Sequence, residues 1–169
     1  MSKFIEIKPE EFNVSPFQLI GKDYMLITAE KDGKINTMTA GWGGLGVMWH
    51  KNVAYVVIRP QRYTKEFVNG SNTFSLTFFN GNSKKMLGYL GTTSGRDEDK
   101  IKKSNLTVIY DNGTPYFKEA VRAIFCKKLF AQDYKPESFI EEEIIDDCYP
   151  ISDFHTLYIA EITKILIKE

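Results

Sequence analysis

Hydrophobic residues along the chain fall mostly into short runs that alternate with polar residues or are rich in β-branched and aromatic side chains. The runs "YMLITA" and "INTMTAGW" flank "EKDGK", whose Asp32-Gly33 pair is typical of a hairpin turn. "NVAYVVIR", "TFSLTFF" and "LTVIY" also have the composition of strands. "AVRAIFCKKLFAQ" and "HTLYIAEITKILI" alternate between two unlike faces over a longer distance, so each predicts one long strand.

Helical signals are few and short. One helix is predicted over about residues 63–68, and a second follows Ser83, a good N-cap for "KKMLGYL". A third is predicted after Asp97, in "DEDKIKKS". "PESFIEEEIIDDCY" predicts the clearest helix, starting at Pro136 and Glu137, with a solvated acidic face and an apolar side formed by Phe139, Ile140 and Ile144. Roughly six to eight strands with a few short helices predict a mainly β fold, a single β-barrel domain over residues 1–169.

Composition narrows the function classes. Of the 169 residues, 43% are hydrophobic and 14% aromatic, and twenty-two basic residues balance twenty-two acidic ones, so no net field favours nucleic acid or an anionic membrane. Cys126 and Cys148 are too few for a disulfide scaffold, and the two histidines, His50 and His155, have no ligand spacing, so no metal site is predicted. The N-terminus "MSKFIEIKPEEF" is charged, unlike a signal peptide, and the apolar runs are shorter than a membrane span. A cytoplasmic protein is expected.

One motif match is rejected. "GWGGLG", residues 41–46, satisfies the dinucleotide-binding pattern G-x-G-x-x-G. That pattern works because its glycines open a helix whose N-terminus holds a pyrophosphate. Here the glycines lead through "VMWHKN" into another strand, so they indicate only that the backbone passes close to something flat or bulky.

Three other segments are candidates for ligand binding, and the first is "INTMTAGWGG". Its strand end is thin enough for a planar ligand to lie against the backbone, with Met38 and Trp42 as apolar walls. The small and hydroxylated residues are Thr37, Thr39, Ala40 and Gly41. The alternative is a glycine-relaxed barrel corner with Trp42 in the core.

The second segment is "RPQRYTKEF", residues 59–67. Arg59 and Arg62 offer forked donors suited to phosphate oxygens, and Tyr63 and Thr64 add hydroxyl groups at the start of the predicted helix, where the backbone carries partial positive charge. The alternative is that both arginines form surface ion pairs with acids such as Glu66 and Glu98.

The third segment is "GTTSGRDEDK", residues 91–100. Two threonines and Ser94 precede Arg96 and Lys100, which would suit a second anion-cradling loop. The alternative is a polar connection in which Asp97 caps the helix that follows. The order of the three segments is informative: a thin strand end, a helix start with two arginines, then a hydroxyl-rich basic loop.

Together these segments resemble a known family. "NTMTAGWGG", "VMWHKNVAYVVIRPQRYTKEF", "NTFSLTFF", "SGRDEDK" and "DFHTLYIAEI" are similar to the flavin reductase-like family of FMN-binding split barrels, in its flavoredoxin-type branch. The likeness runs from about Met25 to Ile162. Gly41 and Asn52 depart from the family pattern, where serine and proline are expected, and Gly41 lacks a hydroxyl that could contact a flavin ring.

The resemblance implies a split β-barrel and FMN as cofactor. It implies that the stretch from Thr37 to Trp42 lines the isoalloxazine ring and ribityl chain, through Thr37, Met38, Thr39, Ala40 and Trp42. It implies that the phosphate end is held by Arg59, Arg62, Tyr63, Thr64, Ser94, Gly95 and Lys100. It also implies a homodimer with FMN near the subunit interface.

The function expected from this resemblance is that of an FMN-binding oxidoreductase that passes electrons from NAD(P)H through the flavin to a flavin or protein acceptor. No separate nucleophile is needed, because the flavin carries the chemistry. His155, just before the last strand, is the candidate for a titratable contact with substrate, and a structural role is its alternative. Two other functions stay open: an FMN electron carrier without its own NAD(P)H site, and a cofactor-free barrel that binds a phosphorylated small molecule.

Overall fold

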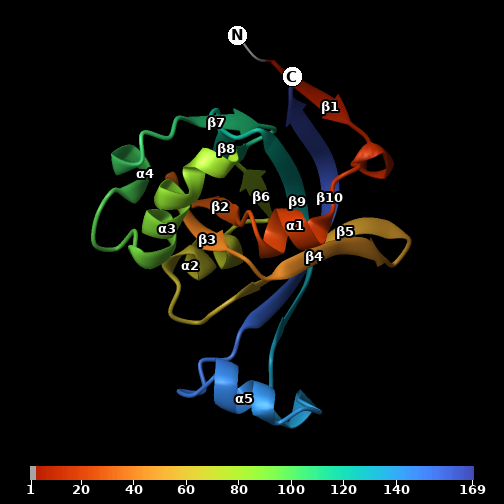
Figure 1. Ribbon diagram of the computed structural model, residues 1–169, viewed down its shortest axis with the longest axis vertical. Coiled ribbons are helices and arrows are strands. Elements are labelled where there is room, and N and C mark those ends of the chain that lie inside the picture. The colour runs from red at the N-terminus through yellow and green to blue at the C-terminus, as the bar shows by residue number, and fades with distance from the viewer. Residues whose placement is uncertain (1–2) are drawn as a thin grey trace.

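The computed structural model describes residues 3–169, which are mainly β (Figure 1). The strands are β1 (Phe4–Ile7), β2 (Met25–Lys31), β3 (Lys34–Ala40), β4 (Gly43–Met48), β5 (Lys51–Ile58), β6 (Thr73–Phe78), β7 (Val108–Asp111), β8 (Thr114–Phe117), β9 (Arg122–Asp133) and β10 (Thr156–Lys168). The α-helices are α1 (Pro16–Gly21), α2 (Tyr63–Gly70), α3 (Lys84–Thr92), α4 (Lys100–Lys103) and α5 (Glu143–Cys148). Three short 3₁₀ turns are η1 (Pro9–Glu11), η2 (Gly81–Ser83) and η3 (Pro136–Ser138).

The main sheet is antiparallel and curls into a split barrel, as predicted. Its strands lie in the order β3-β2-β6-β9-β10-β5-β4, with β1 also paired to β10. β3 and β4 are therefore opposite edges of the sheet, yet only Gly41 and Trp42 join them. Three peptide steps reach at most about 11 Å, so the sheet must bend round until its two edges meet. The ligand-suited strand end lies at this split.

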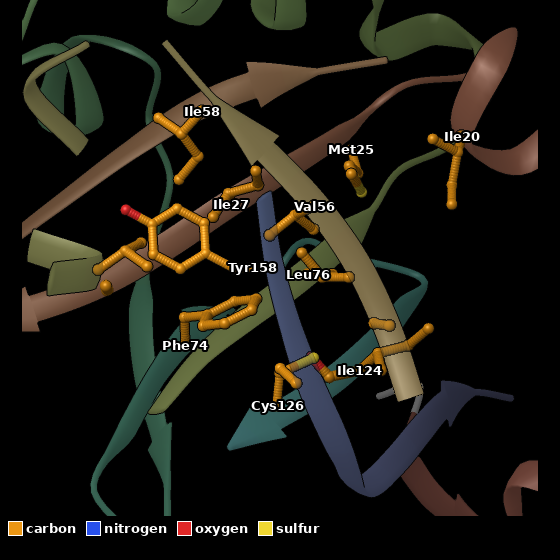
Figure 2. Packing of buried hydrophobic residues seen from close by; sticks show 14 of the residues in the cluster. Ile20, Met25, Ile27, Val56, Ile58, Phe74, Leu76, Ile124, Cys126 and Tyr158 are labelled. Carbon is orange, nitrogen blue, oxygen red and sulfur yellow. The ribbon is translucent and has the colours of Figure 1, made fainter. Parts of the chain in front are cut away.

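The barrel is filled by apolar side chains from strands far apart in the sequence (Figure 2). Ile27 of β2, Val56 of β5, Phe74 of β6 and Tyr158 of β10 are essentially inaccessible to solvent. Cys126 of β9 lies in the same cluster and is fully buried, and this burial raises the pKa of its thiol, so it packs as an apolar residue. The core holds β2, β3, β5 and β10 in the positions that carry the site.

A second apolar cluster fixes the helical side of the molecule. Leu87 and Leu90 of α3 pack with Leu26 of β2 and with Phe117 of β8, while β7 and β8 form a separate two-stranded sheet. This packing holds α3 against β3 and sets the position of the loop between α3 and α4 (residues 93–99). The third predicted ligand segment is therefore anchored beside the first.

Three strands lie outside the predicted set. β1 pairs with the C-terminal half of β10, β8 forms a hairpin with β7, and β4 begins within the glycine run at Gly43. The rejection of "GWGGLG" as a dinucleotide motif is confirmed, because no helix follows these glycines. β4 turns into β5 through Trp49 and His50, which are both at positive φ. Turns of this geometry usually contain asparagine, aspartate or glycine, so the sequence gives no sign of this hairpin.

Two helix predictions need correction. α4 begins at Lys100, and its N-cap is Asp99, whose side chain accepts a hydrogen bond from the Lys102 N–H, so Asp97 is not the cap. The acidic helix predicted from Pro136 is interrupted: a 3₁₀ turn ends at Ser138, and α5 starts only at Glu143.

The interruption lies in the arm, residues 134–155, which stands away from the barrel at the ends of β9 and β10 (Figure 1). The Phe139 ring lies 5.6 Å from that of Tyr149 and 5.7 Å from that of Phe154. These ring contacts turn the chain back at Phe139, and they outweigh local helix propensity. Ile140 is 95% exposed, so the predicted apolar side of one continuous helix does not form.

Candidate flavin site

The larger of two adjoining pockets opens at the split of the barrel. It has a volume of about 400 Å³ and lies between the end of β3, the turn before β2 and the start of β10. Its lining residues are Gly21, Tyr24, Met38, Thr39, Ala40, Gly41, Trp42, Val57, Arg59, Arg62, Gly91 and His155. The pocket combines exposed backbone with aromatic walls, which suits a planar ligand.

The smaller pocket has a volume of about 150 Å³ and lies between the start of α2 and the 93–99 loop. It is lined by Asn36, Met38, Gln61, Arg62, Tyr63, Thr64, Thr92, Thr93, Ser94, Gly95 and Lys100. Met38 and Arg62 line both pockets, so the two form one cleft with a wide end and a narrow end.

Two cations meet at the narrow end. The Arg62 guanidinium donates to the Gly91 carbonyl oxygen at 2.8 Å, and the Lys100 ammonium donates to the carbonyl oxygens of Leu90 and Thr93, both at 2.8 Å. Burial lowers the pKa of Arg62, and burial together with the charge of Arg62 lowers the pKa of Lys100 to about 8. Lys100 is only 3% exposed.

The partners of these two cations are neutral. Within residues 3–169, no carboxylate oxygen lies within ion-pair distance of Arg62 or Lys100. Buried charges are normally paired with an opposite charge, and two like charges close together increase the free-energy cost of keeping each of them ionised. An anion between them would relieve both penalties, so this end of the cleft is suited to a phosphate.

Arg59 is engaged differently. Its Nη1 lies 2.8 Å from the Asp153 carboxylate, and its Nη2 donates to the Cys148 carbonyl oxygen at 2.9 Å. The guanidinium also lies 5.0 Å from the centre of the Tyr149 ring. Arg59 lines the larger pocket, but its charge is already neutralised by the arm.

The acidic residues considered as alternative partners of Arg59 and Arg62 form ion pairs with other residues. Glu66 pairs with Arg96, and Glu98 pairs with Lys103, so neither neutralises Arg59 or Arg62. The surface-pair interpretation of "RPQRYTKEF" therefore holds for Arg59, through Asp153, and does not describe Arg62.

At the wide end, Trp42 is 51% exposed, which excludes the alternative that it belongs to the core. Its ring lies 5.2 Å from that of His155. His155 is 7% exposed, and its Nδ1 lies 2.7 Å from the Tyr149 hydroxyl. Burial, helped by the nearby charge of Arg59, lowers the pKa of His155 to about 4. The imidazole is therefore neutral near pH 7.

Gly41 and Gly91 keep the walls of the wide end thin. A Cβ at Gly41 would lie 2.6 Å from two ring carbons of Tyr24, and one at Gly91 would lie 3.2 Å from Cβ of Thr39. The Thr39 hydroxyl donates to the Leu87 carbonyl oxygen at 2.6 Å. The space that a serine at position 41 would fill is thus taken by the ring of Tyr24.

The structure brings the three predicted segments together. Except for Thr37, all of the predicted cofactor residues line the cleft: Met38, Thr39, Ala40, Trp42, Arg59, Arg62, Tyr63, Thr64, Ser94, Gly95 and Lys100. Thr37 is fully buried on the face of β3 opposite to Met38, where its hydroxyl lies 2.8 Å from that of Thr28 and donates to the Ile27 carbonyl oxygen.

Several lining residues were missed. Tyr24 could have been found, because the predicted hairpin about Asp32-Gly33 pairs Met25 with Ala40 and so places Tyr24 opposite Gly41, whereas no local pattern points to Gly21 at the end of α1. Asn36 could have been found, because it is a polar residue next to the predicted Thr37 and Met38 in a strand that is otherwise mostly buried.

Comparison with known proteins identifies the family. The model of the flavin reductase like domain matches residues 17–169. The chain belongs to the flavin reductase-like family. No curated protein sequence matches this one.

Solved structures share the fold of this flavin reductase-like protein. An FMN-binding domain of a flavin reductases-like enzyme from Shewanella baltica OS155 superposes with a TM-score of 0.71 at 17% identity, covering 98% of this chain and 78% of that one. Flavoredoxin of Desulfovibrio vulgaris (Miyazaki F) has a TM-score of 0.69 at 20% identity, with coverage of 98% and 78%. Flavoredoxin from Methanosarcina acetivorans has a TM-score of 0.67 at 21% identity, with coverage of 85% and 67%.

Two further observations concern metal ligands and membrane-spanning helices. Among residues 3–169, no group of three or more histidine, cysteine, aspartate or glutamate side chains is arranged to hold a metal ion. No helix in the same range is long and apolar enough to cross a membrane.

Proposed function

We propose that the protein binds FMN and acts as an oxidoreductase that passes electrons from NAD(P)H to an acceptor. The observation that carries this proposal is a pair of cations, the half-buried Arg62 and the buried Lys100, with no carboxylate partner among residues 3–169. They lie at the narrow end of a cleft whose wide end is walled by Trp42 and Tyr24. The cleft thus has separate places for a flat ring and for a phosphate group.

The residues present fit FMN. Arg62 and Lys100 would hold the phosphate, with Thr64 and the 93–99 loop around it, while the backbone from Met38 to Trp42 would border the ring. FMN, when bound, supplies two-electron redox chemistry, and the protein contributes position and electrostatics. The positive charge of the narrow end would orient the cofactor before any reaction.

His155 supports a polar contact at the ring end. Its Nδ1 is engaged by the Tyr149 hydroxyl, its Nε2 forms no hydrogen bond with residues 3–169, and its ring borders the larger pocket. Because its low pKa keeps it neutral, it would act through hydrogen bonding and add no charge near the ring.

A neighbouring cavity supports the presence of a second reactant. It has a volume of about 500 Å³ and shares Gly21, Gly41 and Trp42 with the larger pocket. Its other walls are mostly apolar, including Phe17, which is 87% exposed. A nicotinamide or another flat acceptor in this cavity would lie against the wall of the flavin-ring pocket, which favours an enzyme over a carrier that exchanges electrons only with proteins.

We also propose that the protein forms a homodimer. The arm projects from the barrel and carries apolar side chains in the open, with Ile140 95% and Ile151 76% exposed. Covering such residues with a second copy would remove apolar surface from water. Sedimentation of the flavin-loaded protein at micromolar concentration checks this proposal, and a monomer would contradict it.

Two measurements test the proposed function. We expect the purified protein to show flavin absorbance with about one FMN per chain, or to take up FMN when it is added. Under anaerobic conditions, NADH or NADPH should then bleach that absorbance rapidly. Protein that takes up no flavin would overturn flavin binding, whereas a flavin that neither nucleotide reduces would favour the electron-carrier alternative.

A further inference from the structure

The narrow end of the cleft is separated from a third cavity by one layer of protein. This outer cavity has a volume of about 460 Å³ and is lined by Lys34, Arg96 and Glu98, among others. It shares four lining residues with the smaller pocket: Asn36, Tyr63, Gly95 and Lys100. These four residues form the partition between the two spaces.

The partition is tightly packed where the 93–99 loop meets β3. A Cβ at Gly95 would lie 2.1 Å from Oδ1 of Asn36 and 3.3 Å from Cδ1 of Tyr63, so only glycine permits this approach. Asn36 is 4% exposed, and its Nδ2 donates to the Thr64 hydroxyl at 2.9 Å. The Asn36 side of the partition is therefore held in place, and the loop is the part that can move.

Arg96 fastens that loop to the start of α2. Its guanidinium lies 4.5 Å from the centre of the Tyr63 ring, donates to the Gln61 carbonyl oxygen at 3.1 Å, and pairs with the Glu66 carboxylate at 2.5 Å. The side chains of Arg96 and Glu66 are 45% and 52% exposed, so the ion pair adds little to overall stability. Its consequence is positional, because it presses Gly95 against Asn36.

A closed partition would admit FMN to the narrow end of the cleft and would obstruct FAD. FMN ends at its phosphate, whereas in FAD the same phosphate continues into a second phosphate and an adenosine. We propose that Arg96 is a specificity-determining positioning residue, which keeps the narrow end closed so that the site accepts the flavin mononucleotide and excludes the dinucleotide. This inference rests on the proposed function, since it takes the flavin phosphate to lie between Arg62 and Lys100.

The experiment compares dissociation constants of the apo-protein for riboflavin, FMN and FAD, measured by flavin fluorescence. The wild type should prefer FMN over FAD by about tenfold or more, and Arg96→Ala should reduce that preference about tenfold by tightening FAD binding. Riboflavin affinity should not change. Glu66→Gln, which removes the ion pair and keeps the stacking on Tyr63, should shift the ratio in the same direction by less.

Lys51→Ala is the matched control, because Lys51 forms an ion pair of similar exposure with Glu161, on strands away from the partition. It should leave the FMN to FAD ratio unchanged. Equal losses of FMN and FAD affinity in Arg96→Ala would show a direct phosphate contact and overturn the inference. A wild type that binds FMN and FAD equally would also overturn it while leaving flavin binding intact. If no flavin binds, the proposed function fails as well.

Discussion

The two ends of the cleft present different kinds of chemical group to a ligand. At the narrow end, the groups facing a ligand are charged side chains, Arg62 and Lys100, held by backbone carbonyl groups. At the wide end, they are backbone and rings, with Gly41 leaving room for the ring of Tyr24. The charged end should favour ligands that carry an anionic group, whereas the thin, aromatic end should select ligands by the shape of their ring. Loss of either should therefore leave a different signature in binding.

The largest effect is expected from Arg62→Ala. A charge-assisted hydrogen bond contributes roughly 1.5–3 kcal/mol, so FMN affinity should fall by about one to two orders of magnitude. Riboflavin, which lacks the phosphate, should bind almost as before. Arg62→Lys should recover only part of the loss, because an ammonium cannot form the forked contact. The thermal unfolding midpoint of the apo-protein serves as control, and a large drop would indicate a structural role for Arg62.

Removing the second cation should have a somewhat smaller effect. Lys100→Met keeps the length of the side chain and deletes its charge, so FMN affinity should fall by about tenfold while riboflavin affinity stays the same. Isothermal titration with both flavins measures the difference. An equal loss for both flavins would mean that Lys100 supports the shape of the cleft and does not contact the phosphate.

The lowered pKa of Lys100 should make both the stability of the apo-protein and its FMN affinity depend on pH. In the folded apo-protein its pKa is about 8, below the ordinary 10.5, so the unfolded chain binds more protons between these values and the free energy of unfolding should rise with pH across this window. Bound phosphate would favour the charged ammonium, so FMN affinity should decline as pH rises above 8. Lys100→Met should remove both trends, as denaturant titrations and binding measured between pH 7 and 10 would show.

A smaller effect is expected at the wide end. Gly41→Ala would place a methyl group against Tyr24, and such overpacking costs typically about 1–3 kcal/mol, part of which the partly exposed ring can avoid by moving. FMN and riboflavin should both weaken, by the same factor of a few-fold. The double variant Gly41→Ala/Tyr24→Ala checks the cause, because removing the ring should make the Gly41 change nearly neutral. A selective loss of FMN would contradict the division between the two ends.

The smallest effect on flavin selectivity is expected for Arg59→Ala. Because the Arg59 charge is already paired with Asp153, the ratio of FMN to riboflavin affinity should stay the same. The arm should instead lose its tether, through Asp153 and the Cys148 carbonyl group, and limited proteolysis within residues 134–155 should become faster. A fall in FMN affinity like that of Arg62→Ala would assign Arg59 to the phosphate.

Much of the narrow end could be predicted from sequence because its determinants are local. Arg62, Tyr63 and Thr64 follow one another directly at a helix start, and Lys100 lies in a short hydroxyl-rich segment. The fold class was also within reach, since alternating runs identify strands by their period of two. Of the three strands that were not predicted, β4 has glycine at three of its first four positions and therefore lacks this alternation.

Tertiary structure alone decided which charges remain available and which chain segments meet. Arg59 and Arg62 read alike in sequence, but Asp153, far along the chain, neutralises one and leaves the other facing Lys100. Likewise, Phe139 breaks a helix only because Tyr149 and Phe154, more distant in the chain, lie beside it. Local sequence encodes propensity and chemistry. Pairing and burial depend on long-range contacts, which only the folded chain determines.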